Sequence, residues 1–181
     1  MVPNNTARLQ FRQLTLSDIG NLCTIFCDAD TMLYYPAPYT NKQVETFICK
    51  MIKSYTDNGF GLWALIRKHD QQFLGDCGIT MQNIDGDVVP EIGYHIHKNY
   101  WKQRYATEAA QVCLPYGFDT LHFDELFIHT FVKNKPSLRV AEKLGMMFVK
   151  EYEKYIESND IVMRHVVYSI KKEQFDNLAS R

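Results

Sequence analysis

The stretch VPEIGYHIHKNYWKQRYATEAA, residues 89–110, decides how the rest of the chain is arranged. Apolar residues alternate from Ile92 to Ile96, which predicts a strand with one buried face. A short loop from Tyr100 to Arg104 leads into an amphipathic helix, whose apolar residues recur at helical spacing from Ala106 to Phe118. Such a loop directs backbone N–H groups toward the helix N-terminus, which adds about half a positive charge. The junction is therefore predicted to bind phosphate.

Residues 101–109 read WKQRYATEA, and at this place the chain resembles a known family. The segment is similar to the acetyl-CoA-binding segment of GNAT-fold N-acetyltransferases, in the subgroup typified by the ribosomal-protein N-terminal acetyltransferases. That subgroup usually reads W-G-x-G-Y-A-T-E-A. The residues shared with this pattern are Trp101, Tyr105, Ala106, Thr107, Glu108 and Ala109. Lys102 and Arg104 depart from it, because glycines usually stand at these two positions.

A second segment, NKPSLRVAEKLGMMFVKEY at residues 134–152, supports the resemblance. The family pattern here is N-x-x-S-x-x-V-x-x-K-L-G-F. The matching residues are Asn134, Ser137, Val140, Lys143, Leu144 and Gly145, with Met146 in place of the usual Phe. The resemblance extends over most of the chain, roughly from Arg8 to Ile170. Two motifs at this separation are far more specific than either motif alone.

Composition indicates one globular domain, residues 1–181, with enough chain for a full core. Apolar residues make up 46% of the chain, and 20 basic against 21 acidic residues give a net charge of −1. This balance gives no reason to expect a nucleic-acid partner. No apolar run approaches the length of a membrane span, and the N-terminus lacks the apolar core of a secretory signal. We therefore expect a cytoplasmic protein that has no membrane partner.

The five cysteines are an odd number and lie on periodic apolar segments: Cys23, Cys27, Cys49, Cys77 and Cys113. The Cys23-x-x-x-Cys27 spacing could form half of a metal site, but it fits one face of a helix equally well, and no matching Cys/His pair follows. We therefore expect no metal and favour buried, reduced thiols.

The remaining periodicities predict the element order β-α-α-β-β-β-α-β-α-β-β. The expected strands are Leu9–Leu14, Phe60–Lys68, Phe73–Ile84, the strand through Ile92–Ile96, Phe123–Lys133, Met147–Ile156 and Ile161–Ile170. The expected helices contain Ile19–Phe26, follow Thr40 up to Asn58, start at Ala106, run from about Lys135 to Leu144, and end the chain at Lys171–Leu178. The fold class is α/β (α+β), and the resemblance implies a GNAT fold. That fold has a mixed, mostly antiparallel sheet with helices on both faces and a splay between the central strands.

Four local expectations follow from particular residues. Gly75 weakens its strand and indicates a bulge. Pro115 lies inside the predicted helix and should remove a hydrogen bond and kink it. The strand Phe123–Lys133 is apolar on both sides, so both faces are expected to be covered. The aromatic segment Thr31–Tyr39 fits either a buried connector or a wall of the acceptor pocket, and the resemblance favours the wall.

The resemblance implies transfer of an acetyl group to an amine, and this reaction needs a base. A lysine-like amine has a pKa near 10.4, so removing its proton at pH 7 costs about 4–5 kcal/mol. Glu91 is the candidate base, acting directly or through water; its alternative is a solvated carboxylate at the strand start. Three strand histidines, His95, His97 and His129, are weaker candidates, because a lone strand histidine is more often structural.

The leaving thiolate needs a proton donor, and the resemblance assigns this role to Ser137. Ser137 could instead be a polar residue in the first turn of a helix. Asn134 has a structural interpretation as an N-cap, and the resemblance adds a hydrogen bond to the pantetheine arm of acetyl-CoA. These two roles are compatible.

Further acetyl-CoA contacts are expected from backbone groups. The strand backbone at Tyr94, His95 and Ile96 would pair with the pantetheine amides, because the splay leaves these groups unpaired. The pyrophosphate would bind the loop and the helix start: Lys102, Gln103, Arg104, Tyr105, Ala106 and Thr107. Arginine at position 104 is expected to keep the N–H direction only with ordinary dihedrals, its side chain lying outward along the phosphates. The alternative is a side chain that blocks the site.

Together these features predict an N-acetyltransferase that uses acetyl-CoA and attacks directly from a primary amine in a ternary complex. The acceptor could be a protein N-terminus, a small-molecule amine such as a polyamine, or an antibiotic. The alternative is a GNAT-fold acyl-CoA-binding regulatory module with little turnover, which the two replaced glycines keep open. Dimers are common among relatives, so a homodimer is possible, although the sequence carries no decisive signal for one.

Overall fold

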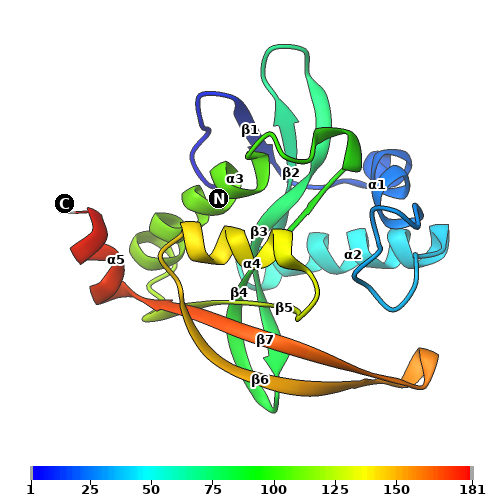
Figure 1. Cartoon of the computed structure of the whole chain (residues 1–181). Coiled ribbons are helices and arrows are strands. Elements are labelled where there is room, and N and C mark those ends of the chain that lie inside the picture. Colours follow the sequence, from blue (N-terminus) through cyan, green and yellow to red (C-terminus); the bar gives the residue numbers. More distant parts are fainter. Residues whose placement is uncertain (1, 180–181) are drawn as a thin grey trace.

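A seven-stranded sheet in the order β1-β2-β3-β4-β5-β7-β6 organises the protein (Figure 1). The computed structural model describes residues 2–179. The strands are β1 Leu9–Arg12, β2 Leu62–Arg67, β3 Gln72–Ile84, β4 Asp87–Ile96, β5 Glu125–Phe131, β6 Met147–Ile156 and β7 Ile161–Lys171. The helices are α1 Ile19–Phe26, α2 Asn41–Asp57, α3 Tyr105–Pro115, α4 Lys135–Lys143 and α5 Lys172–Ala179. This is the element order predicted from sequence, with the terminal helix α5 as the final element.

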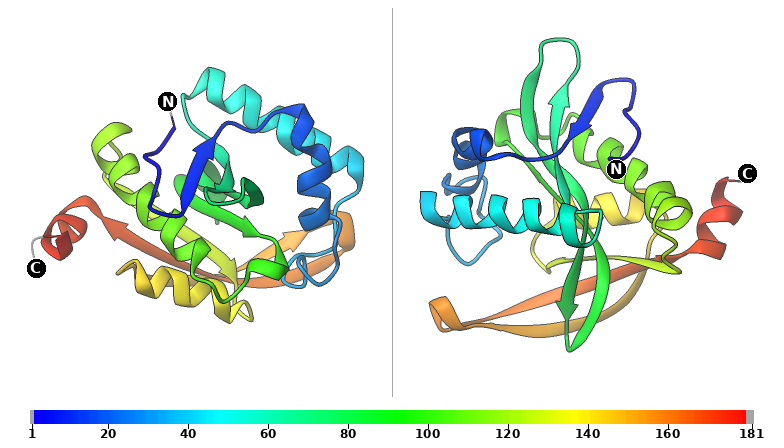
Figure 2. Two further views of the ribbon diagram at one scale, coloured as in Figure 1. Left: turned by 90° about the horizontal axis from the view of Figure 1, so that it is seen from above. Right: turned by 180° about the vertical axis from the view of Figure 1, so that it is seen from behind.

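The sheet is mixed and mostly antiparallel, as predicted. Every neighbouring pair of strands is antiparallel except β4 and β5, which run parallel. Helices α1 and α2 lie on one side of the sheet, and α3 and α4 lie on the other (Figure 2). Each side has its own apolar core, built around Trp63, Ile79 and Ile92 under α3 and around Phe26, Ile48 and Ala64 under α1 and α2.

Local sequence explains where the elements start and stop. Thr40 caps α2, because its side chain accepts a hydrogen bond from the Gln43 backbone N–H and Gln43 reaches back. The β3–β4 hairpin turns at Asp85 and Gly86, whose φ angles of 55° and 94° are those of a tight hairpin turn. The predicted bulge is also present: the β2–β3 register shifts between Leu65 and Ile66, and Gly75 has a φ of 149°.

Several expectations were wrong in detail. Helix α3 starts at Tyr105 rather than Ala106. At Pro115, where a lost hydrogen bond and a kink were expected, α3 ends and the chain continues as a π-helix from Tyr116 to Thr120, in which the Leu121 N–H bonds the Tyr116 carbonyl. A wider helical turn thus accommodates the missing proline N–H.

The expected cover on both faces of β5 was half correct. Leu126 and Ile128 are buried against the α3 core, but Phe127, His129 and Phe131 on the other face are only partly buried. The cysteines also differ from expectation. All five are free, but only Cys77 and Cys113 are buried, with their sulfur atoms 3.7 Å apart, while Cys49 is exposed. Among residues 2–179, no cluster of metal-ligating side chains is present, and no helix has both the length and the apolar content that crossing a bilayer requires.

Candidate functional site

The two central strands separate after a single paired position. Strands β4 and β5 pair only at Glu91 and Phe127, whereas β4 stays paired with β3 as far as Ile96. From Gly93 to Ile96, the β5-facing edge of β4 therefore has no strand partner within the described chain. This is the splay predicted from sequence. Unpaired backbone groups at such an edge are suited to an extended ligand that can supply the missing hydrogen bonds.

The loop at the start of α3 adopts the glycine-type backbone even though it has no glycine. Lys102 and Arg104 have φ angles of 61° and 66°, and Arg104 is the N-cap of α3 without a side-chain cap. Left-handed geometry costs a non-glycine residue roughly 1–2 kcal/mol. The expectation of ordinary dihedrals at position 104 was therefore wrong. The backbone shape that a phosphate loop needs is retained, at a cost in strain.

The loop side chains leave the backbone accessible. Lys102, Gln103 and Arg104 are exposed, while the following Tyr105 is buried. Arg8 lies over the Tyr105 ring at 4.4 Å and pairs with Glu108 at 2.5 Å, which ties the first turn of α3 to β1.

The side chains of β4 project to both faces of the sheet, and Tyr94 projects toward α4. Its hydroxyl lies 2.8 Å from the Ser137 hydroxyl and 3.2 Å from the Ser137 backbone carbonyl. Asn134 caps α4 as predicted, because its side-chain oxygen accepts a hydrogen bond from the Ser137 N–H at 3.3 Å. Burial raises the pKa of Tyr94, although the Ser137 hydrogen bond opposes this shift. Tyr94 therefore stays a neutral phenol that can donate a hydrogen bond.

Glu91 projects to the opposite face and is not the solvated carboxylate of the alternative interpretation. It is 8% exposed, and its Oε1 lies 2.7 Å from Nδ1 of His129 on β5. The angle at Nδ1 falls short of hydrogen-bond geometry, so this contact is an ion pair only when His129 is protonated. The His129 backbone N–H also points to Oε1 at 3.4 Å. The structure thus brings together two residues that sequence reasoning considered separately.

Two further titratable groups stand beside this pair. The rings of His165 and Tyr152 lie 5.5 Å and 6.3 Å from the His129 ring. Burial raises the pKa of Tyr152 to about 12, with a contribution from the charge of Glu91, and its buried hydroxyl has no hydrogen-bond partner. Burial also lowers the pKa of His165.

A second carboxylate–imidazole pair lies on the same face. Asp76 of β3 is fully buried, and its Oδ1 lies 2.7 Å from Nδ1 of His95 on β4. Three aromatic rings surround the imidazole: Phe26 at 4.7 Å, Tyr35 at 5.6 Å and Phe47 at 6.3 Å. These rings come from α1, from the connector after α1, and from α2.

The connector Thr31–Tyr39 joins this arrangement through Tyr35. The residue is 38% exposed, yet burial is the largest influence raising the pKa of its hydroxyl, followed by the charges of Glu91 and Asp76. Tyr35 is therefore partly exposed and lies close enough to both carboxylates to be affected by their charges. The connector thus packs beside the Asp76–His95 pair through Tyr35, and its role as a wall of an acceptor pocket, which the resemblance favoured, stays a prediction.

These groups form a polar stripe, which we define as Asp76, Thr80, Glu91, His95, His129 and His165. The β3–β4 register places Thr80 opposite Glu91 and Asp76 opposite His95. The β5–β7 register places His165 opposite Phe131, which lies two residues after His129 and therefore on the same face. All six residues thus lie on the α1–α2 face of the sheet. Burying charged groups costs free energy unless they are paired. The two carboxylates on this face each lie 2.7 Å from a histidine nitrogen, which offsets part of that cost.

Sequence reasoning missed several members of this site. Asp76, Tyr35 and the side chain of Tyr94 were not singled out, although a buried tyrosine in an alternating strand must usually find a hydrogen-bond partner. That rule would have pointed to Tyr94. His97 lies outside the stripe, because its Nδ1 accepts a hydrogen bond from the Asn99 N–H beyond the end of β4.

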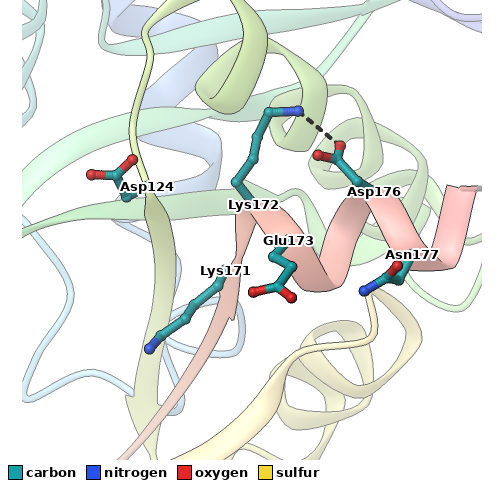
Figure 3. A pocket seen from close by; sticks show the side chains of 6 residues that line it. All are labelled: Asp124, Lys171, Lys172, Glu173, Asp176 and Asn177. Atoms are coloured by element: carbon teal, nitrogen blue, oxygen red, sulfur yellow. Dashed lines mark hydrogen bonds and ion pairs between the residues drawn. The ribbon is translucent and has the colours of Figure 1, made fainter.

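A surface hollow lies elsewhere, where β5 begins and β7 ends. It has a volume of about 470 Å³ and is lined by Asp124, Lys171, Lys172, Glu173, Asp176 and Asn177 (Figure 3). Lys172 bonds Asp176 at 2.8 Å and Asp119 at 2.9 Å, so its charge is already compensated within the fold. Glu91 and Ser137 do not line this hollow, and we assign it no role in the site.

Known proteins match both the sequence and the fold. The model of the acetyltransferase (GNAT) domain matches residues 8–147. The Bacillus subtilis (strain 168) protein YkkB is 35% identical over 151 residues, covering 83% of this chain and 88% of YkkB. An acetyltransferase of the GNAT family from Bacillus anthracis is 26% identical, with a TM-score of 0.78, covering 96% of this chain and 99% of that chain.

A more distant structure shares the fold alone. Spermidine N-acetyltransferase from Vibrio cholerae, solved with CoA and spermine, is 16% identical with a TM-score of 0.75, covering 95% of this chain and 100% of that one. The domain match takes in the splay, the loop before α3, and all but the last residues of the Asn134 segment. The chain therefore belongs to the GNAT acetyltransferase family.

Proposed function

We propose that this protein transfers the acetyl group of acetyl-CoA to a primary amine by direct attack in a ternary complex. One observation carries the proposal. At the point where β4 and β5 part, β4 presents Glu91 on one face and Tyr94, bonded to Ser137, on the other. A proton acceptor and a proton donor thus flank the same splay, and the reaction requires both.

The splay and the loop fit acetyl-CoA as a cosubstrate. The free edge of β4 at Tyr94, His95 and Ile96 offers hydrogen bonds to an extended pantetheine arm. Within the backbone of Lys102–Ala106, Lys102 and Arg104 have the positive φ angles through which glycine-rich loops approach phosphate. The Vibrio cholerae spermidine N-acetyltransferase, solved with CoA, shares this fold. Both observations support acetyl-CoA as the acetyl donor here.

The proposed proton transfers follow from the positions of these groups. Glu91 takes a proton from the ammonium, directly or through water, and the neutral nitrogen attacks the thioester carbonyl. The N–C bond forms, and the C–S bond breaks with its electron pair on sulfur. The Ser137 hydroxyl, hydrogen-bonded to Tyr94, gives its proton to the thiolate, and solvent restores it. Glu91 returns its proton to solvent to complete the cycle.

Release of the CoA thiol in the presence of primary amines tests this proposal. Amine-dependent thiol release, with an acetylated amine as product, is expected. Binding of acetyl-CoA without transfer to any amine would favour the alternative, an acyl-CoA-binding regulatory module. The suggested homodimer is a separate prediction, and sedimentation equilibrium of the purified chain would check it.

A further inference from the structure

We propose that His95, held by Asp76, is a specificity-determining residue. Its Nε2 accepts a hydrogen bond from a hydroxyl or ammonium group of the amine substrate. That group lies at a distance from the amine nitrogen that receives the acetyl group. The proposal rests on the proposed function and names its substrate class: an elongated amine with a second hydrogen-bond donor, a hydroxyl or an ammonium group. No alkyl monoamine meets this description.

The Asp76–His95 contact fixes the hydrogen-bonding polarity of the imidazole. Nδ1 lies 2.7 Å from Oδ1 of a fully buried carboxylate, which holds a proton on Nδ1, and in this tautomer Nε2 is a hydrogen-bond acceptor. No described residue hydrogen-bonds Nε2, and it does not belong to the buried, unpartnered atoms. Nε2 is therefore open to a ligand, while the His95 side chain as a whole is 17% exposed.

The surroundings of His95 are those of a binding recess. Phe26 and Phe47 meet the imidazole edge-on, and Tyr35 stands beside it, so aromatic rings from three segments of the chain surround the imidazole. The usual composition of small-molecule sites is the same, with apolar walls and a few polar groups that fix orientation.

The spacing along β4 separates this recess from the proposed base. Glu91 and His95 share a face and lie four residues apart, which places their Cα atoms about 13 Å apart at the rise of a strand. One small amine nitrogen cannot contact both side chains. If Glu91 serves the reacting nitrogen, His95 must contact a different group of the same acceptor.

Asp76→Asn provides the sharpest test, because it should change Nε2 from a hydrogen-bond acceptor to a hydrogen-bond donor. The other oxygen of Asp76, Oδ2, is buried without a hydrogen-bond partner. An asparagine NH₂ at that position would be an unsatisfied buried donor, so the amide should turn its NH₂ toward Nδ1 instead. The imidazole proton then moves to Nε2, which becomes a donor. Asparagine at the equivalent carboxylate position of a serine protease triad gives the wrong imidazole tautomer in the same way.

The experiment compares hexylamine, aminohexanol, hexamethylenediamine and methoxyhexylamine as acceptors, with shorter and longer homologues. The wild type should favour the aminohexanol and diamine over hexylamine by about tenfold or more in kcat/KM, mostly through KM. In Asp76→Asn the preference for the diamine should vanish, because its ammonium only donates, whereas the aminohexanol hydroxyl can also accept and should keep its preference. Methoxyhexylamine, whose ether only accepts, should gain. His95→Gln should lose the preference as well. His69→Gln, an exposed histidine with no part in the site, is the matched control and should behave as wild type.

Nitrogen NMR of the histidine-labelled protein gives a readout that does not depend on turnover. His95 Nε2 should be unprotonated in the wild type, protonated in Asp76→Asn, and shifted by aminohexanol but not by hexylamine. Equal kcat/KM for all four amines, or no shift at Nε2, would overturn the inference while leaving the proposed function intact. A loss of kcat for every amine in His95→Gln would make His95 the proton acceptor instead. If no amine is acetylated, the proposed function fails, and the Nε2 titration decides the inference independently.

Discussion

The Tyr94 phenol oxygen lies 2.8 Å from the Ser137 hydroxyl oxygen, so the central strand and helix α4 are joined by a polar contact beside the splay. Ser137→Ala removes the proposed proton donor and should lower kcat by about a hundredfold, with a much smaller effect on acetyl-CoA binding. Steady-state kinetics together with calorimetry would separate the two effects.

Two variants control this prediction. Tyr94→Phe should lower kcat by a smaller factor, because Ser137 keeps its hydroxyl but loses its partner. Ser17→Ala, at an exposed position far along the chain, should leave kcat unchanged. An unaltered kcat in Ser137→Ala would reduce Ser137 to a residue of the first helical turn.

Glu91→Gln keeps the size of the side chain but removes its basicity. We expect kcat at neutral pH to fall by about a hundredfold, because general-base catalysis typically contributes this much. The rise of kcat with pH should also change, because the carboxylate that accepts the proton is gone. A pH–rate profile of kcat measures both effects. Glu45→Gln, on the exposed side of α2, is the control. A profile identical to that of the wild type would place the base elsewhere in the recess.

The loop residue Arg104 allows an unusually clean substitution, because its backbone already has a glycine-type φ of 66°. Arg104→Gly should keep the loop shape and remove only the side chain. Acetyl-CoA affinity should then be equal or weaker, and Arg104→Glu should weaken it clearly, whereas Lys50→Glu on exposed α2 should not. Calorimetry measures these affinities. Tenfold tighter binding of Arg104→Gly, about 1.4 kcal/mol, would show that the arginine blocks the phosphate site.

Gly75 is required by close backbone approach in the strand that carries Asp76. A Cβ at this position would lie 1.9 Å from the His95 backbone carbonyl, and φ is 149°. Gly75→Ala should therefore destabilise the fold by about 3 kcal/mol or more in urea unfolding. Gly20→Ala is the matched control, because nothing lies within 4 Å of its added Cβ in α1. The free energy of unfolding of the control should rise by about 0.5–1 kcal/mol. Equal changes in this free energy for both variants would contradict the strand geometry.

His165 should make stability depend on pH. Burial lowers its pKa in the folded state, helped by the neighbouring His129, so the unfolded chain binds the proton more readily. The contribution of His165 to the free energy of unfolding is therefore complete above its unfolded pKa of about 6.5, and it is lost as the pH falls below that value. In His165→Asn, the free energy of unfolding measured in urea should fall less steeply between about pH 8 and pH 5 than in the wild type. A pH dependence as steep as in the wild type would exclude His165 as its source.

Much of the fold could be predicted because its signals are local. The helix starts after Thr40 and at Asn134 were predicted and are present, and the turn at Asp85-Gly86 likewise depends on residues only a few positions apart. The two motifs also located the loop before α3 and the start of α4. The mostly antiparallel character of the sheet came from the family resemblance, and the strand order was not predicted, since no local pattern determines which distant strands pair.

The site chemistry was harder to predict because it depends on non-local register. His129 reaches Glu91 only because β5 lies beside β4, and Asp76 reaches His95 only through the β3–β4 pairing. No spacing in the sequence shows either contact. The prediction of the loop dihedrals was wrong for another reason. A lysine and an arginine in left-handed geometry contradict local backbone preference, and only the surrounding fold can hold them there.

Amine-dependent release of CoA from acetyl-CoA, with mass analysis of the product, tests the central claim most directly. The account predicts thiol release that requires a primary amine, a product heavier by one acetyl group, and loss of both in a Glu91→Gln, Ser137→Ala double variant that still binds acetyl-CoA. Tight acetyl-CoA binding with no acetylated product from any amine, or turnover unchanged in the double variant, would contradict it.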